Sequence, residues 1–203
     1  MTFNPCPIPD LWKIDLAPRP DERGWLVRTF CEESFAGHGL NTRWPQASST
    51  RTLSQGTIRG MHWQAHPAAE AKLLRCVRGA IWDVVVDLRP RSPSFGQWLA
   101  FNLSESIPSQ LYIPHGCAHG FQSTTDDVEL SYLMSAPYDP ALARGFRWDD
   151  PALAIPWPLP PVLVSPRDRS LPLLAEALAE PMGPVPWNDC AADSFARRGV
   201  IKA

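Results

Sequence analysis

Apolar and polar side chains alternate with a period of two over residues 80–88, the clearest pattern in the chain. The apolar positions of this segment are Trp82, Val84, Val86 and Leu88. Asp83 and Asp87 fall on the alternate positions and therefore share the opposite face. Because successive side chains of a strand point to opposite faces, this spacing predicts a β-strand rather than a helix.

Shorter segments of the same kind recur along the chain, separated by turn signals. We expect further strands at residues 11–16, 25–30, 98–103, 110–113, 120–123 and 128–134, and β-compatible sequence at 44–52 and 56–79. Short strands spaced by roughly 8–12 residues are typical of a β-sandwich or a barrel. A helical turn at 32–39 and a helix at 171–180 are the exceptions. The expected fold class is therefore all-β, with a few short helices near the C-terminus.

Proline content and chain length support this prediction. The 203 residues include 23 prolines spread along the chain. An interior proline removes a helical hydrogen bond and clashes with the preceding turn, so long helices are disfavoured. The length suits one domain with its own core, which we assign to residues 1–180. Residues 181–203 lack periodicity, and we expect them to form a loosely docked or disordered tail.

Charge and cysteine content exclude several classes of function. The formal net charge is −2, and the basic residues are scattered rather than gathered into a stripe that would follow a nucleic acid. The five cysteines form no Cys-x-x-Cys pair, which favours reduced thiols. The chain shows no leader pattern at its start and no apolar run near the ~18 residues of a membrane span. We expect a soluble, cytoplasmic protein that binds neither nucleic acid nor a membrane.

Two segments contain the candidate chemistry. Residues 56–79 hold Arg59, His62 and Lys72, and residues 114–120 hold His119. A histidine among cations suits an anionic substrate that contains a carbonyl group. Neutral histidine is a competent base near neutral pH, and a neighbouring lysine can stabilise the enolate formed by proton abstraction.

The spacing of Gly56, His62 and Gln64, followed by Pro-x-Gly-x-x-His at residues 114–119, resembles the two motifs of the cupin superfamily. The resemblance implies a double-stranded β-helix, or jelly-roll, barrel whose mouth holds a metal or an organic ligand. In metal-binding cupins the motifs supply three histidines and a glutamate. Here Gln64 replaces one histidine and Lys72 falls where the carboxylate would be. An amide is a poor ligand and a protonated lysine repels a cation, so we expect no metal.

Longer motifs are specific to one family. Residues 59–64, 72–89, 92–98, 113–121 and 148–151 closely resemble, in order, the dTDP-4-dehydrorhamnose 3,5-epimerase family of nucleotide-sugar epimerases. The likeness extends from about Asp21 to Glu176. It implies epimerisation, without a cofactor, of a nucleotide-linked 4-keto-6-deoxyhexose. The C4 ketone acidifies both C3 and C5, so that one base can serve both carbons.

The resemblance also implies roles for individual side chains. The residue matching His62 is the base, and an aspartate matching Asp168 orients it. Tyr132 matches the acid that returns a proton from the opposite face, and Lys72 matches the residue that steadies the C4 oxyanion. The positions implied to hold the sugar, the diphosphate or the nucleotide base are Arg23, Gln46, Arg59, His119, Tyr138 and Arg167.

Three positions depart from the family pattern where the family contacts its substrate. Arg28 and Ala143 stand where a glutamate is usual, and Ser48 stands where an asparagine is usual. We count Arg28 and Ser48 among the candidate binding residues. The departures leave open which nucleotide and sugar are bound and whether C3, C5 or both are inverted. A cupin that binds a nucleotide sugar without turning it over, and a metal-dependent cupin, are the alternatives.

Other polar residues near the motifs are assigned no chemistry. We interpret His66, Glu70, His115 and Asp83 as loop or structural residues. Family members are usually dimers that exchange N-terminal strands. The resemblance therefore implies a homodimer, with residues 10–30 as the exchanged segment.

Overall fold

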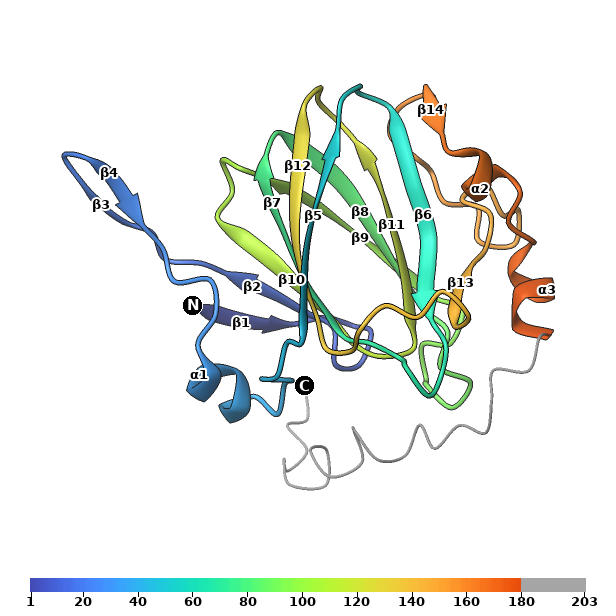
Figure 1. Ribbon diagram of the computed structural model, residues 1–203, viewed down its shortest axis with the longest axis horizontal. Coiled ribbons are helices and arrows are strands. Elements are labelled where there is room, and N and C mark those ends of the chain that lie inside the picture. The colour runs from blue at the N-terminus through green and yellow to red at the C-terminus, as the bar shows by residue number, and fades with distance from the viewer. Residues whose placement is uncertain (180–203) are drawn as a thin grey trace.

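Two antiparallel sheets face each other in the computed structural model, which describes residues 1–179 (Figure 1). The first sheet has the order β1 (Thr2–Pro5), β2 (Trp12–Asp15), β10 (Ser109–Ile113), β7 (Lys72–Arg78), β12 (Val128–Met134) and β5 (Gln46–Thr52). The second has the order β13 (Ala143–Gly145), β6 (Thr57–Gln64), β11 (Cys117–Ser123), β8 (Ala80–Asp87) and β9 (Trp98–Ser104). Consecutive strands from β5 to β8 alternate between the sheets, which is the connectivity of a jelly roll. The all-β prediction is confirmed.

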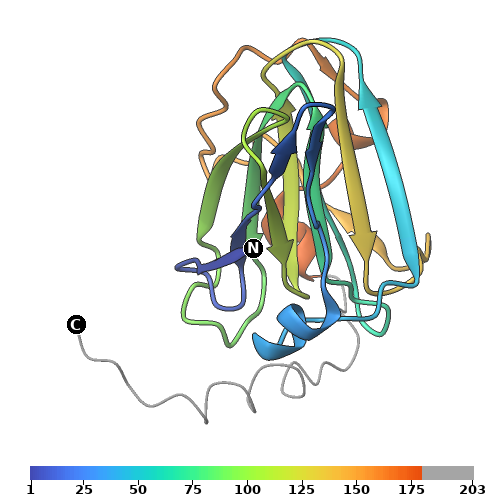
Figure 2. The same ribbon diagram turned by 90° about the vertical axis from the view of Figure 1, so that its left-hand side faces the viewer.

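In the described part of the chain, residues 1–179, three short helices lie outside the sheets. Helix α1 (Glu32–Gly37) packs Phe35 beside β1 and β2, whereas α2 (Pro166–Arg169) and α3 (Leu174–Ala179) lie along the second sheet (Figure 1, Figure 2). The helix expected at 171–180 therefore begins later than its pattern suggested. The described residues contain no helix both long and apolar enough to cross a membrane. The tail expected at 181–203 lies outside the described residues.

The N-terminal hairpin differs from the prediction. The strand expected over residues 25–30 ends at Leu26, and it forms a two-stranded hairpin of β3 (Arg19–Asp21) and β4 (Gly24–Leu26). Gly24 has φ +132°, which only glycine adopts readily, and this allows the tight turn. The hairpin extends away from the barrel (Figure 1), and its strands pair with no third strand among residues 1–179. This isolation is why the strand stops short.

The period-two pattern of β8 is confirmed, and the structure shows which face is internal. Val84 and Val86 pack on the outside of the second sheet, in a cluster that includes Leu174 of α3. Val85 belongs to the cluster between the two sheets, and Asp83 shares its face. Both faces of β8 are therefore buried, and the face bearing a carboxylate points into the barrel.

One end of β8 is anchored by a buried ion pair. The Asp87 carboxylate, with no exposed surface, accepts hydrogen bonds from Arg89 Nε at 2.8 Å and from Ser94 Oγ at 2.7 Å. Arg89 Nη2 also donates to the Pro9 carbonyl oxygen at 2.9 Å, which ties this end to the segment before β2. Burial alone raises the pKa of Asp87, but these hydrogen bonds hold it below its usual range.

Removing this carboxylate should destabilise the barrel. Asp87→Ala leaves the Arg89 guanidinium buried without its main partner, and we expect the free energy of unfolding to fall by about 3–5 kcal/mol. Urea denaturation followed by tryptophan fluorescence measures the change. Asp127→Asn is the control, because Asp127 pairs with Arg51 and Arg78 at the surface, where its loss should hardly move the midpoint. Equal losses in both variants would contradict the assignment.

Candidate active site

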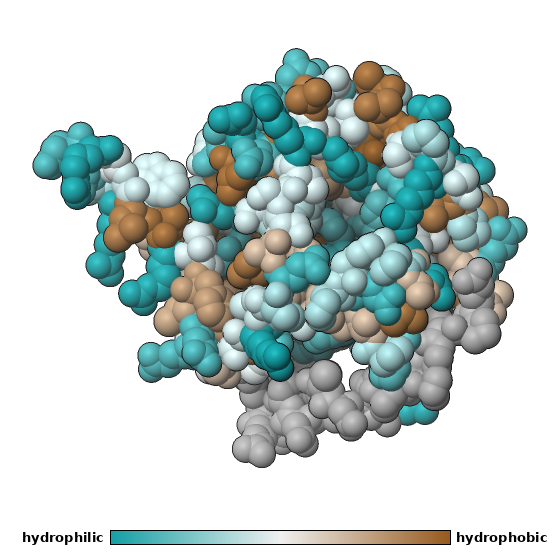
Figure 3. Space-filling model, in the orientation of Figure 1, coloured by the Kyte–Doolittle hydropathy of each residue, from teal (hydrophilic) through white to brown (hydrophobic). Residues whose placement is uncertain are grey.

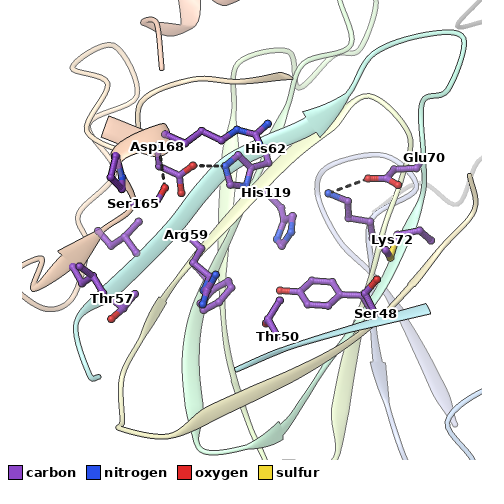
Figure 4. A pocket seen from close by; sticks show the side chains of 17 residues that line it. Ser48, Thr50, Thr57, Arg59, His62, Glu70, Lys72, His119, Ser165 and Asp168 are labelled. Atoms are coloured by element: carbon purple, nitrogen blue, oxygen red, sulfur yellow. Dashed lines mark hydrogen bonds and ion pairs between the residues drawn. The ribbon is translucent and has the colours of Figure 1, made fainter. Parts of the chain in front are cut away.

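A cavity of about 580 Å³ opens between the two sheets and is closed on one side by α2 (Figure 4). The sequence-predicted residues that line it are Ser48, Arg59, His62, Lys72, His119, Tyr132, Arg167 and Asp168. They come from β5, β6, β7, β11, β12 and α2. The structure therefore gathers most of the predicted site into one chamber.

A histidine and an aspartate form the tightest polar pair in this cavity. His62 Nε2 lies 2.7 Å from Asp168 Oδ1, and Asp168 Oδ2 accepts a hydrogen bond from the Gly60 amide at 3.3 Å. Burial raises the pKa of Asp168, but the bonds from His62 and Gly60 lower it below its ordinary value. An ionised Asp168 accepts the Nε2 proton of His62, so that Nδ1 keeps the lone pair that can take a proton.

Local sequence explains how Asp168 reaches β6. The two residues of β14 (Leu163–Val164) pair in parallel with the start of β6, and α2 begins directly after them. The Ser165 hydroxyl accepts a hydrogen bond from the Asp168 amide at 3.0 Å, and Pro166 takes the first helical position. The single helical turn therefore has a fixed start, which aims Asp168 at His62.

Gly60 is required where β6 and β11 approach closely. It has φ +138°, and an added Cβ would lie 2.6 Å from the Cα of Gly120. The same amide donates to Asp168, so the close approach of the strands and the orientation of His62 depend on one glycine.

Tyr132 enters the cavity from the first sheet, opposite His62. Its ring centroid lies 6.1 Å from that of His119. Burial raises the pKa of Tyr132. The Thr50 hydroxyl and the charge of Arg59 act in the opposite direction without reversing the shift. The phenol therefore keeps its proton at neutral pH, as a proton donor must.

Lys72, in β7 of the first sheet, places a cation at the wall of the cavity. Its Nζ lies 3.3 Å from Glu70 Oε1, and both side chains are nearly buried. Both residues line the cavity, and Figure 4 shows the pair facing it. An ammonium group held here can stabilise negative charge on an oxygen bound in the cavity.

His119 forms a second histidine–aspartate pair deeper in the barrel. Its Nδ1 lies 3.3 Å from Asp83 Oδ2, and both side chains are buried. Burial lowers the pKa of His119, and the charges of Lys72 and His62 lower it further. Burial raises the pKa of Asp83 well above its usual range.

Two arginines can meet an anionic group at the cavity. Arg59 donates from Nε to Thr52 Oγ1 and from Nη2 to the Arg51 carbonyl oxygen, each at 3.0 Å. These bonds fix the guanidinium at the wall and leave its other Nη group for a ligand. Arg167 lines the cavity from α2.

Four predicted binding residues lie outside the cavity of their own chain. Arg23 is on the projecting hairpin and pairs with Asp21 at 2.6 Å, and Arg28 follows that hairpin as an exposed residue. Figure 3 shows the hairpin standing away from the body with hydrophobic side chains on its surface. Gln46 and Tyr138 are joined at 2.8 Å, from the Tyr138 amide to Gln46 Oε1.

Glu70 and Asp83, interpreted from the sequence as structural residues, both belong to the site. Glu70 lines the cavity and Asp83 contacts a residue that does. The sequence feature that could have identified Asp83 as a site residue is its position in β8, on the face opposite the alternating apolar residues. His115 does have a structural contact, to Ser135 Oγ at 3.2 Å.

Gln64 is turned away from the cavity. Its Nε2 donates to the carbonyl oxygens of Ala68 and Pro137 at 2.6 and 3.0 Å, and its Oε1 accepts from the Asp139 amide at 2.8 Å. The amide therefore braces two loops at the position where metal-binding cupins place a ligand. Within residues 1–179, no three His, Cys, Asp or Glu side chains are grouped closely enough to hold a metal ion.

The two-sheet barrel with its site enclosed between the sheets defines a cupin-type jelly roll, and its cavity is lined by a histidine–aspartate pair, a lysine and a tyrosine. The family model described as dTDP-4-dehydrorhamnose 3,5-epimerase matches residues 5–176. The chain therefore belongs to the dTDP-4-dehydrorhamnose 3,5-epimerase family.

Individual relatives agree with this assignment. The chain is 40% identical over 177 residues to the dTDP-4-dehydrorhamnose 3,5-epimerase of Sinorhizobium fredii, covering 87% of this chain and 91% of the relative. It is 40% identical over 178 residues to a dTDP-4-dehydrorhamnose 3-epimerase of Streptomyces niveus, covering 87% and 86%. A solved Legionella pneumophila epimerase in complex with dTDP-4-keto-L-rhamnose superposes with a TM-score of 0.81 at 33% identity, covering 86% and 93%.

Metal dependence can be tested directly. Because Gln64 is fully engaged by the loops and Lys72 is a cation, we expect the purified protein to contain no stoichiometric metal. Elemental analysis by mass spectrometry measures this, and prolonged dialysis against EDTA should leave the turnover rate unchanged. A metal bound at one equivalent, with activity lost on chelation and restored by that metal, would contradict the expectation.

Proposed function

We propose that the protein inverts C3, C5 or both of a dTDP-linked 4-keto-6-deoxyhexose, without a cofactor and in the cytoplasm. One observation carries the proposal: His62 with Asp168 from one side, and Tyr132 from the opposite sheet, line the same cavity. Inversion at carbon needs a base and an acid on opposite faces of the sugar, and this arrangement supplies them. Family membership supports the nature of the substrate.

His62 acts as the base in this proposal. Its Nε2 donates to Asp168, so Nδ1 removes the proton from the carbon next to the C4 ketone. The imidazolium that forms is stabilised by the Asp168 carboxylate at 2.7 Å. The electrons move to the C4 oxygen, and the Lys72 ammonium holds the resulting enolate.

Tyr132 returns a proton to the other face of the same carbon. Its buried phenol is protonated in the resting enzyme, so it can donate. Afterwards His62 carries the abstracted proton and Tyr132 lacks one, and exchange with water restores both. The net reaction is an isomerisation that consumes no co-reactant.

The remaining lining residues position the substrate. Arg59 and Arg167 pair with the diphosphate, while His119 and Ser48 bind the sugar. Gln46 and Tyr138, which are joined to each other, bind the nucleotide base beyond the rim of the cavity.

Deuterium incorporation separates the two catalytic roles. With dTDP-4-keto-6-deoxyglucose in D₂O, the wild-type protein should give a product labelled at each inverted carbon, as read by NMR. His62→Asn should slow both exchange and inversion by about 10²–10⁴-fold. Tyr132→Phe should keep exchange with retained configuration and lose inversion, because His62 can still remove and return the proton from one face.

The outcomes distinguish this proposal from its rivals. Inversion that persists in Tyr132→Phe would show that another group is the acid. A folded wild-type protein that is stabilised thermally by the ligand but incorporates no deuterium would be a binding protein rather than an epimerase.

We propose further that two copies of the chain form a homodimer through the β3–β4 hairpin. Leu26 and Trp25 are 76% and 60% exposed on a hairpin whose two strands pair only with each other among residues 1–179. The one cation–π contact of the hairpin within those residues is that of the Arg75 guanidinium of β7, 5.9 Å from the Trp25 ring centroid. Arg23 at its tip lies away from the cavity of its own chain. A second copy that accepts the hairpin would bury these side chains and bring Arg23 of the partner subunit to the nucleotide.

Leu26→Glu tests the dimer. The charge should disfavour burial of the hairpin, convert the dimer to a monomer in light scattering, and raise the KM for the nucleotide sugar by roughly tenfold. Leu53→Glu is the control, because Leu53 is 67% exposed in the turn after β5 and away from the hairpin. A wild-type monomer, or a Leu26→Glu protein that remains dimeric with unchanged KM, would contradict the proposal.

A further inference from the structure

Two histidine–aspartate pairs at the cavity differ in contact distance and in the exposure of the histidine. The His62–Asp168 contact is 2.7 Å long, and the His62 side chain is 34% exposed. The His119–Asp83 contact is 3.3 Å long, and its side chains are 8% and 0% exposed. A hydrogen bond between charged groups is usually 2.7–2.9 Å long. The first pair has the geometry of a charge-assisted bond and the second does not.

Asp83 also lacks the partners that an ionised carboxylate requires. Its Oδ1 is buried and has no hydrogen-bond partner among residues 1–179. A buried charged oxygen without a donor is strongly destabilising, whereas the carbonyl oxygen of a protonated acid is much less so. Lys72, the cation whose charge acts on Asp83, already faces Glu70 at 3.3 Å. The surroundings therefore favour a protonated Asp83.

We propose that Asp83 is a positioning residue that donates its own proton to Nδ1 of His119, so that His119 presents a neutral Nε2–H to an oxygen of the bound sugar. With Nδ1 facing Asp83, Nε2 is the ring nitrogen left for the cavity, which His119 lines. The ring lies between His62 and Lys72 in Figure 4. The inference deepens the proposed function and rests on it for the identity of the ligand.

The electrostatics of the neighbouring groups agree with this proton placement. Burial raises the pKa of Asp83 and lowers that of His119, so both groups favour their neutral forms. The charge of Lys72 opposes the first shift and reinforces the second. His62 also lowers the pKa of His119, and the neighbouring Tyr132 is itself neutral.

A neutral His119 favours proton abstraction by His62, the proposed base. His119 and His62 are directly opposed in the register of β11 and β6, which places their side chains close together. His62 becomes positively charged when it removes a proton from the sugar. A charged His119 would repel that imidazolium and weaken the base, whereas a neutral donor still binds the sugar oxygen without adding charge.

The tautomer of His119 can be measured without substrate. Two-bond ¹H–¹⁵N NMR correlations assign each histidine ring, with His119→Gln used to identify the signals. We expect neutral His119 with hydrogen on Nε2 throughout pH 6–8. Hydrogen on Nδ1, or on both nitrogens, near neutral pH would overturn the proposal whether or not the protein is an epimerase.

Substitution at Asp83 supplies the second test. Asp83→Ala removes the donor, and we expect kcat to fall by about 100-fold. Asp83→Asn keeps the shape and can donate Nδ2–H to His119, so we expect it to restore kcat to within tenfold of the wild type and to keep hydrogen on Nε2. Asp168→Asn is the matched comparison, because there an ionised carboxylate is replaced, and we expect a loss of more than 100-fold.

The conservative variant decides the outcome. An Asp83→Asn protein that is folded by circular dichroism and more than tenfold below wild-type kcat would show that Asp83 acts as an anion, and the proposal would be wrong. Absence of epimerase activity in the wild-type protein would remove the proposed function but leave the tautomer measurement valid.

Discussion

The hydrogen bond between His62 Nε2 and Asp168 Oδ1 joins two parts of the chain that are 106 residues apart, and the site depends on it. His62 is fixed by the barrel, whereas Asp168 belongs to a single turn of helix placed by β14 and capped by Ser165. The bond selects which ring nitrogen is available as a base. It also requires the barrel to be closely packed at Gly60, because the same carboxylate accepts the Gly60 amide. The 2.7 Å contact between His62 and Asp168 therefore depends on the packing of the barrel and also sets the protonation of the His62 ring.

Burial determines where protons reside in the cavity. The phenol of Tyr132 keeps its proton because ionisation in a buried site is unfavourable. Asp168 is ionised because several donors outweigh its burial. In the proposed mechanism, the acid Tyr132 is therefore protonated and the base His62 is supported by an anion.

The sequence predicted the strands well where one face is buried. It predicted them less well where tertiary contacts determine the end of a strand or which face points inward. The period of two in β8 was sufficient to identify that strand, but the same pattern is compatible with either face pointing inward. That ambiguity concealed Asp83, which lies on the inward face of a strand that is buried on both sides. Glu70 was missed for a related reason, since its pairing with Lys72 depends on how the loop before β7 approaches the cavity. The strand expected over residues 25–30 ends at Leu26, because it pairs with β3 in the projecting hairpin and not with a strand of the barrel. Resemblance identified the residues of the cavity, whereas the placement of Arg23 and Arg28 required three-dimensional information.

In the proposed mechanism the two reacting side chains, His62 and Tyr132, lie on different sheets, so turnover requires that the two sheets stay packed together. A state in which one sheet has come apart from the other would retain most of its local hydrogen bonds and still separate His62 from Tyr132. Spectroscopic signals of β-structure would then survive while catalysis disappeared. In this protein, loss of activity is expected to precede loss of secondary structure as the barrel is heated. Activity depends on the distance between the two sheets, whereas the secondary structure depends on hydrogen bonds within each sheet.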